Sequence, residues 1–323
     1  MVNEDSLATI LLVGRLREEP VEPLKASEFW SLCNRVAKPS ALLGLGVEQL
    51  AAEHGLAGDL AVRIATLLDR AMGMALELEH LDQTGISTLT PFEDHYPRRF
   101  IDLLGATAPA LLYAAGAVES LDEPGVGVVG SRDVSPEGAD LAAAAAKLTA
   151  RLGLPVVSGG ARGIDQTAMN AAFQAGGSVV GVLAESLARK LRSADVRRAI
   201  YEGCTVMCTP YSPEAPFSVG NAMGRNKLIY ALSDLTLVVA ADVGTGGTWA
   251  GATETLKRGF GRVAVWRGAG EGPGNALLED RGAVPITSLD ELQATVLGRA
   301  RPASGETRRA EPVSPTPQPA LFD

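Results

Sequence analysis

From residue 126 onward, short apolar segments rich in β-branched residues alternate with longer segments rich in alanine. Strands of a parallel sheet that are buried on both faces have such continuous apolar sequences, and helices connect them. The predicted strands are the segments 126–129, 155–157, 178–183, 205–208, 235–240, 262–266 and 284–286. The predicted helices between them are the segments 138–152, 164–174, 185–201, 224–231 and 249–258. This alternation predicts an α/β fold with a doubly wound, mainly parallel sheet.

The regions on either side of this alternation have different patterns. Residues 1–88 carry leucine and isoleucine at helical spacing with interrupting glycines, which predicts several short helices in a small all-α domain. We expect residues 89–123 to connect this domain to the sheet domain, residues 124–298. Residues 299–323 contain five prolines and few large apolar side chains before the final Leu-Phe-Asp, so we expect a disordered tail.

Composition excludes some classes of protein. The 46% of hydrophobic residues is enough for a sizeable core. Lys and Arg number 29 against 38 Asp and Glu, a formal net charge of −9, so a nucleic-acid site must be a local positive patch on an acidic protein. Three cysteines, Cys33, Cys204 and Cys208, make no disulfide framework and no zinc motif. With no signal-peptide pattern and no long apolar run, we expect a soluble, cytoplasmic protein that has no membrane contact, metal or cofactor.

Three glycine-rich turns each follow a predicted strand and precede a predicted helix. They read Val-Gly-Ser-Arg at 129–132, Ser-Gly-Gly-Ala-Arg-Gly at 158–163 and Gly-Thr-Gly-Gly-Thr at 244–248. In a parallel sheet the carboxyl ends of the strands share one edge, so we expect the turns to converge. Glycine lets the backbone approach a ligand, and the N–H groups of helix N-termini attract phosphate. The turns match neither the dinucleotide-binding motif nor the P-loop, so they predict an anion-binding groove of another kind.

A fourth segment, Gly-Asn-Ala-Met-Gly-Arg-Asn-Lys at 220–227, precedes a predicted helix. We expect Arg225, Asn226 and Lys227 in the first turn of that helix, within reach of a bound phosphate; the alternative is a solvated helix start. Asp165 is expected to cap the helix after the second turn; the alternative is that it orients Arg162. No Ser-His-Asp, Cys-His or paired-carboxylate arrangement stands out, so we predict no catalytic residues.

The turns resemble those of the DNA-processing protein A (DprA/Smf) family. The resemblance rests on GVGVVGSRDVSPEG, PVVSGGARGIDQTAMNAAFQAGG and GNAMGRNKLIYALSDLTLVVAA, in this order, and covers roughly residues 75–286. It implies a Rossmann-like domain that binds single-stranded DNA, forms a homodimer and helps to load a RecA-type recombinase, as in natural transformation or related recombination and repair. It also implies a sterile-alpha-motif-like (SAM-like) N-terminal domain.

The resemblance and the turns together give a set of candidate binding residues. The family's DNA-phosphate pocket corresponds to Ser131, Arg132, Gly159, Arg162, Gly163, Asn221, Arg225 and Asn226. The turns and the fourth segment add Gly130, Ser158, Gly160, Lys227, Gly246, Gly247 and Thr248.

The sequence departs from the family pattern in places that leave a second function open. Met169 stands where the family has a histidine, and the third turn reads Gly-Thr-Gly-Gly. That turn resembles the loop of LOG-type nucleotide phosphoribohydrolases, which use a glutamate three residues after the Gly-Thr pair. Here Gly251 has that position and Glu254 lies a turn further along. The alternative function is therefore a nucleotide-binding sensor or hydrolase that uses the same glycine-rich pocket.

The chain ends in Gln-Pro-Ala-Leu-Phe-Asp. Gln318, Leu321 and Phe322 resemble the pentapeptide with which bacterial replication and repair proteins bind the sliding clamp. Adjacent Leu and Phe side chains on a flexible tether suit an apolar pocket on a partner. The alternative is that this segment folds back onto its own domain.

Overall fold

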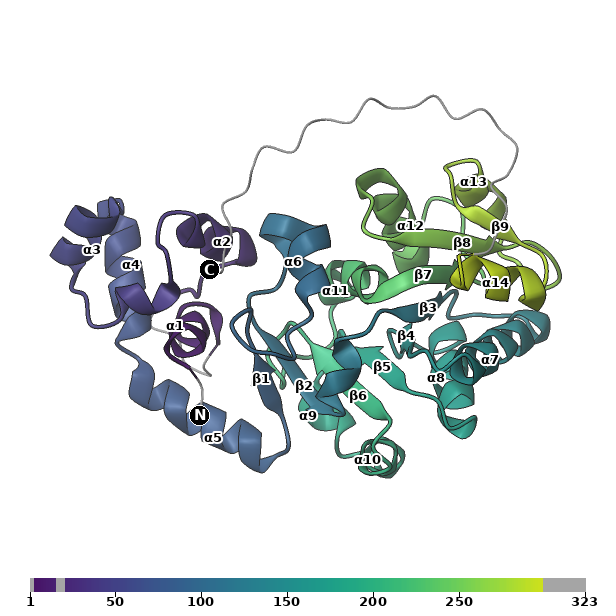
Figure 1. Ribbon diagram of the computed structural model, residues 1–323, viewed down its shortest axis with the longest axis horizontal. Coiled ribbons are helices and arrows are strands. Elements are labelled where there is room, and N and C mark those ends of the chain that lie inside the picture. The colour runs from purple at the N-terminus through teal and green to yellow at the C-terminus, as the bar shows by residue number, and fades with distance from the viewer. Residues whose placement is uncertain (1–2, 16–20, 299–323) are drawn as a thin grey trace.

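The computed structural model describes residues 3–15 and 21–298, and the structural statements below refer to these residues (Figure 1). Short helices make up the N-terminal part, as the sequence predicts. Leu12, Phe29 and Ile64, from three of these helices, are fully buried. Gly55, with φ 61°, ends one helix at a glycine that interrupts the apolar pattern. The elements are α1 (Glu4–Val13), α2 (Ala26–Cys33), η1 (Pro39–Leu42), α3 (Val47–His54), α4 (Gly58–Leu68) and α5 (Ala71–Gln83).

The rest of the described chain contains one sheet of nine strands, and their order across the sheet is β1-β2-β6-β5-β4-β3-β7-β8-β9. All pairs from β6 to β9 in this order are parallel, while β1–β2 and β2–β6 are antiparallel. The doubly wound, mainly parallel sheet is therefore confirmed. The strands are β1 (Ser87–Leu89), β2 (Leu112–Gly116), β3 (Gly125–Val129), β4 (Val156–Ser158), β5 (Val179–Val182), β6 (Thr205–Thr209), β7 (Ser233–Val238), β8 (Arg262–Trp266) and β9 (Val284–Ile286).

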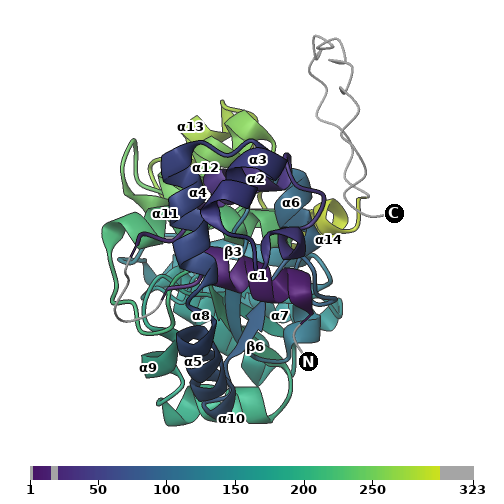
Figure 2. The same cartoon turned by 90° about the vertical axis from the view of Figure 1, so that its left-hand side faces the viewer.

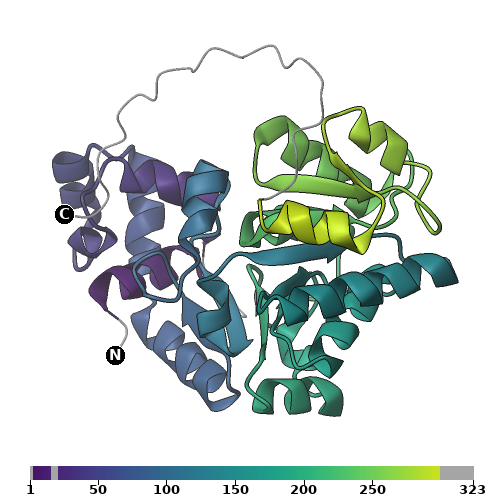
Figure 3. The ribbon, with the colours of Figure 1, turned by 45° about the vertical axis from the view of Figure 1, so that its right-hand side comes forward.

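Helices cover both faces of this sheet. Helices α7 and α8 pack on one another, and α14 packs on α7; Figure 3 shows α7 and α14 in front of the strands. Helices α11 and α12 pack together beside β7 and β8. Figure 1 shows α1–α5 at one end of the sheet, and this end faces the viewer in Figure 2. The remaining elements are α6 (Arg98–Leu104), η2 (Gly105–Thr107), η3 (Val118–Leu121), α7 (Pro136–Arg151), α8 (Ile164–Gln174), α9 (Leu187–Lys190), α10 (Ala194–Tyr201), α11 (Val219–Leu232), α12 (Gly246–Arg258), α13 (Asn275–Glu279) and α14 (Leu289–Val296).

The structure differs from the sequence-based expectations at several elements. Strands β1 and β2 lie outside the predicted alternation, and β2 joins residues from the expected connecting region to the sheet through β6. The predicted helix 185–201 is two helices, α9 and α10. Helix α11 begins at Val219, earlier than predicted, because the Ser218 hydroxyl accepts a hydrogen bond from the Asn221 N–H at 2.9 Å and caps the helix there.

Two further predictions concern membrane contact and the C-terminal segment. Within residues 3–15 and 21–298, no helix is long and apolar enough to cross a membrane. Residues 299–323, the expected tail with the predicted clamp-binding residues Gln318, Leu321 and Phe322, lie outside the described residues.

Candidate nucleic-acid interface

A cavity of about 530 Å³, which we call the first cavity, lies at the carboxyl edge of the sheet. Strand β3 pairs there with β4 on one side and with β7 on the other, and ligands of doubly wound sheets bind where the strand order reverses in this way. The first residues of α8, α11 and α12 contribute to its wall. Predicted binding residues that line it are Gly130, Ser131, Arg132, Arg225, Asn226, Gly246, Gly247 and Thr248.

Hydrogen bonds join the turns around this cavity. The Thr248 hydroxyl donates to the carbonyl of Gly130 at 3.1 Å, which connects the third turn to the first. The Asn226 Nδ2 donates to the carbonyl of Gly247 at 2.9 Å and connects α11 to the third turn. Segments more than a hundred residues apart thus form one wall, as the positions of the turns at the strand ends predict.

Several glycines of the turns are explained by how closely these segments pack. A Cβ on Gly130 would lie 2.6 Å from the Cγ1 of Ile164, at the start of α8. Gly163 has φ +87°, and its Cβ would lie 2.5 Å from the carbonyl oxygen of Ser131. These glycines bring the first two turns together.

Arg225 lies beneath the first cavity, in the second turn of α11 and not in the first turn as predicted. Its side chain is buried, and its Nη2 donates to the carbonyl of Gly159 at 2.9 Å. Burial lowers the pKa of this guanidinium, and the carboxylate of Asp165 opposes that shift. Arg225 therefore contributes a positive charge that is fixed in position below the cavity floor.

Asp165 is buried beside Arg225, near the start of α8. Its Oδ2 accepts a hydrogen bond from the N–H of Gly159 at 3.2 Å. Burial raises the pKa of this carboxyl to about 6, while the charge of Arg225 acts in the opposite direction. The prediction that Asp165 caps its helix is wrong, since Gly163 is the N-cap and the carboxylate instead holds the second turn.

The rim of the first cavity combines a cation with exposed apolar side chains. The guanidinium of Arg132 lies 5.4 Å from the centre of the Phe217 ring, a cation–π geometry. Phe217, Val219 and Met223 are 45%, 72% and 41% exposed, and all three line the cavity. The exposed Asp242 is also on the rim. The site thus offers backbone N–H groups and an arginine to an anion, and a ring face to a flat apolar group.

Five other predicted residues, all from the second turn, do not line this cavity. The Ser158 hydroxyl is buried and donates to the carbonyl of Val128 at 2.6 Å, while Gly159, Gly160 and Gly163 shape the backbone below. Arg162 lies on the surface, where it pairs with Asp133 at 2.8 Å; the two side chains are 72% and 89% exposed.

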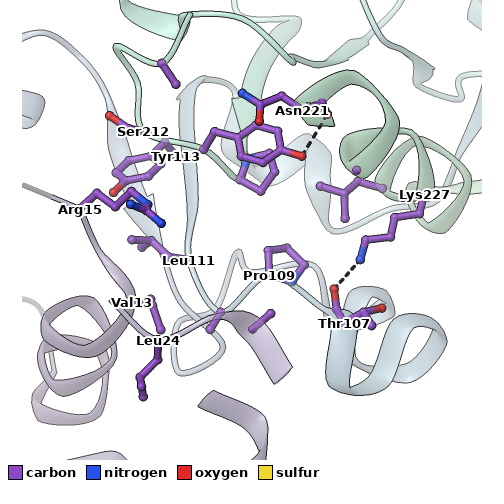
Figure 4. A pocket seen from close by; sticks show the side chains of 17 residues that line it. Val13, Arg15, Leu24, Thr107, Pro109, Leu111, Tyr113, Ser212, Asn221 and Lys227 are labelled. Atoms are coloured by element: carbon purple, nitrogen blue, oxygen red, sulfur yellow. Dashed lines mark hydrogen bonds between the residues drawn. The ribbon is translucent and has the colours of Figure 1, made fainter. Parts of the chain in front are cut away.

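Asn221 and Lys227 line a different cavity, of about 550 Å³, which we call the second cavity (Figure 4). It lies between the N-terminal helices and the other face of α11. The Nζ of Lys227 donates there to the carbonyl of Thr107 at 2.9 Å. Residues of the fourth segment, 220–227, therefore line two different cavities. The predicted helix start at residue 224 did not indicate this.

Sequence reasoning missed the apolar part of the first cavity. Phe217 follows Ala-Pro in a segment without strand or helix periodicity. The only signal that could have indicated it is its position directly before Ser218, the residue that caps α11. Glu254, the glutamate nearest to the hydrolase position, does not line the cavity; its carboxylate lies 3.5 Å from the guanidinium of Arg258 on the same helix.

Comparisons with known proteins show which family this chain resembles. Residues 87–296 match the family model described as DNA recombination-mediator protein A. A DprA-type protein of Mycobacterium tuberculosis is 31% identical over 262 residues, which cover 73% of this chain and 65% of that protein's length. The crystal structure of DNA processing protein A from Streptococcus pneumoniae matches with a TM-score of 0.61 and 25% identity, over 84% of this chain and 98% of that one.

A second structural relative is DNA processing protein A from Helicobacter pylori, a protein with a structurally described single-stranded DNA binding mode. It matches with a TM-score of 0.55 and 27% identity, over 67% of this chain and 97% of that one. Because the family model covers more than half of the chain, and both structures share the Rossmann-like fold, the chain belongs to the DNA recombination-mediator protein A (DprA/Smf) family.

Proposed function

We propose that this protein binds single-stranded DNA at the first cavity and acts, without catalysing a reaction, in recombination. The observation that carries the proposal is the combination on one rim of Arg132, the exposed ring of Phe217 and three helix N-termini. Helix N-termini and arginine bind phosphates, and exposed aromatic rings stack on unpaired bases. The Helicobacter pylori relative, which binds single-stranded DNA, supports the same ligand.

In this proposal the candidate residues have three different roles. Residues that would contact the DNA backbone are Gly130, Ser131, Arg132, Gly246, Gly247 and Thr248. Arg225 and Asn226 hold the walls in place, and Arg225 also supplies a fixed positive charge below the floor. Arg162 would add charge at the outer edge once a phosphate competes with Asp133 for it.

The partners and the cellular role are part of the same proposal. Family membership supports a cytoplasmic homodimer that protects single strands and passes them to a RecA-type recombinase, in natural transformation or in repair. The chain spans 65% of the length of the Mycobacterium tuberculosis relative, and these roles belong to the whole protein. The segment with Gln318, Leu321 and Phe322 is proposed to bind the sliding clamp.

Fluorescence anisotropy with labelled oligo-dT tests the DNA site. Arg132→Ala should weaken binding to any sequence and lower the slope of log affinity against log salt by about 0.7, the value for one phosphate contact on a single strand. Arg192→Ala is the control, because Arg192 is exposed and lines neither cavity. Equal salt slopes for the wild type and Arg132→Ala would contradict the assignment. Competition by free mononucleotides at low concentration would instead favour the nucleotide-binding alternative.

A further inference from the structure

The second cavity lies between parts of the chain that are far apart in sequence. Figure 4 shows Val13 and Leu24, from the N-terminal helical part, on one side, and Ser212 and Asn221 on the opposite side. The walls are mostly apolar, with the rings of two tyrosines, Tyr113 and Tyr211, among the lining side chains. This cavity is as large as the first one, and the proposed function has not used it.

One helix separates the two cavities. On α11, Ala222, Met223 and Asn226 line the first cavity, whereas Asn221, Gly224 and Lys227 line the second. An α-helix with its side chains is about 10–12 Å wide, a distance that three or four stacked nucleotides cover at about 3.4 Å each. Three or four nucleotides are therefore long enough to span α11 from one cavity to the other.

The hydroxyl of Tyr211 contacts the face of α11 that lines the second cavity. The Tyr211 hydroxyl donates to the carbonyl of Asn221 at 3.0 Å. It also lies so close to Gly224 that a Cβ there would be 2.6 Å from it. Burial raises the pKa of Tyr211, so its hydroxyl keeps the proton that it donates.

The charge of the second cavity suits a polyanion. Arg15 and Lys227 line it, and none of the described lining residues is Asp or Glu. The guanidinium of Arg15 pairs with Glu22 at 2.7 Å, but both side chains are more than half exposed, so a phosphate can replace this partner. Lys227 uses one of its three N–H donors on Thr107 and has others for a ligand. An acidic peptide would satisfy the two cations, but it would leave the partly exposed ring of Tyr211 without a flat partner.

We propose that the second cavity holds further nucleotides of the strand bound in the first cavity, so that the N-terminal helical part extends the DNA footprint. This inference rests on the proposed function. The strand would cross α11, place phosphates near Lys227 and Arg15, and place bases against the apolar wall and the ring of Tyr211.

The test is the dependence of affinity on oligonucleotide length, with oligo-dT of about 4, 8, 12 and 20 nucleotides, a range that covers known single-strand site sizes. Wild-type affinity should rise with length. Arg15→Glu should keep the wild-type affinity for the shortest oligonucleotide and lose about tenfold for the longest, the scale of one stacked base or less. Arg35→Glu is the matched control, since Arg35 is an exposed arginine of the same helical part and lines neither of the two cavities.

A second variant distinguishes loss of space in the cavity from an indirect effect of the charge reversal in Arg15→Glu. Ser212→Trp places a bulky ring in the cavity without changing charge, and it should remove the same gain with length. Identical length dependence for wild type, Arg15→Glu and Ser212→Trp would overturn the inference while leaving the first cavity as the DNA site. Failure of the wild type to bind any oligonucleotide would overturn the proposed function as well. Binding of a deca-glutamate peptide that Arg15→Glu abolishes, with unchanged length dependence, would assign the cavity to an acidic partner and overturn the inference.

Discussion

The guanidinium of Arg225 occupies the space that a side chain at Gly159 would need. A Cβ on Gly159 would lie 1.6 Å from the Nη1 of Arg225, and the Nη2 donates to the carbonyl of the same glycine. The Nε and Nη1 of this buried arginine have no hydrogen-bond partner among the described residues. Because a buried cation without partners is costly, the position of Arg225 depends on Gly159 and on the nearby carboxylate of Asp165.

Gly159→Ala should therefore destabilise the protein. The added methyl group displaces the guanidinium and breaks its hydrogen bond, and we expect the free energy of unfolding to fall by about 2–4 kcal/mol. Urea denaturation followed by circular dichroism measures this change. Gly58→Ala is the control, because Gly58 has negative φ and a Cβ added there would meet no atom within 4 Å. Equal losses in the two variants would show that Arg225 moves aside at no cost.

Asp165→Asn should change how stability depends on pH. In the folded protein burial raises the pKa of Asp165 from 3.8 to about 6. The folded state therefore binds more protons than the unfolded state between about pH 4 and pH 6, and stability must fall as the pH rises through this window. The free energy of unfolding of the wild type minus that of Asp165→Asn should fall by about 2 kcal/mol from pH 4 to pH 7, and level off above it. Denaturant titrations at several pH values test this, and a constant difference would refute it.

The sheet could be predicted because its central strands are buried on both faces and therefore continuously apolar. Val126, Val180 and Val263 are each almost fully buried in such strands. Strand β2 has the sequence Leu-Tyr-Ala-Ala-Gly and pairs antiparallel with β6. Its alanines have no strong strand preference, and the partner that makes it a strand lies about ninety residues away, so local pattern did not reveal it.

The part of the candidate site that could be predicted is the part that depends on backbone topology. The glycine-rich turns at the strand ends predicted that Gly130 and Gly247 lie close together, because this depends on topology alone. The Ser218 hydroxyl caps α11 at Val219, so Arg225 and Lys227 lie inside the helix and not in its first turn. Residues two positions apart within a helix point to opposite sides, and this is why Lys227, expected beside Arg225, lies in another cavity.

Phe217 should contribute to DNA affinity through its ring, beyond its contact with Arg132. Phe217→Ala removes both the surface on which a base can stack and the partner of the Arg132 guanidinium, and we expect a loss of about 1–3 kcal/mol in binding free energy for oligo-dT. Phe217→Trp keeps an aromatic face and should restore most of the affinity, whereas Phe217→Leu, which keeps apolar volume only, should not. Val243→Ala is the control, because Val243 is 49% exposed in the nearby loop and does not line the cavity.

The order of these variants separates stacking from simple burial of apolar surface. If Phe217→Leu binds oligo-dT as tightly as the wild type, the ring acts only as apolar volume and the base-stacking role is wrong. If the salt slope of Phe217→Ala also falls, the ring acts by holding Arg132 against a phosphate, since a base contact alone releases no counterions. Anisotropy titrations at two salt concentrations give both quantities from the same samples.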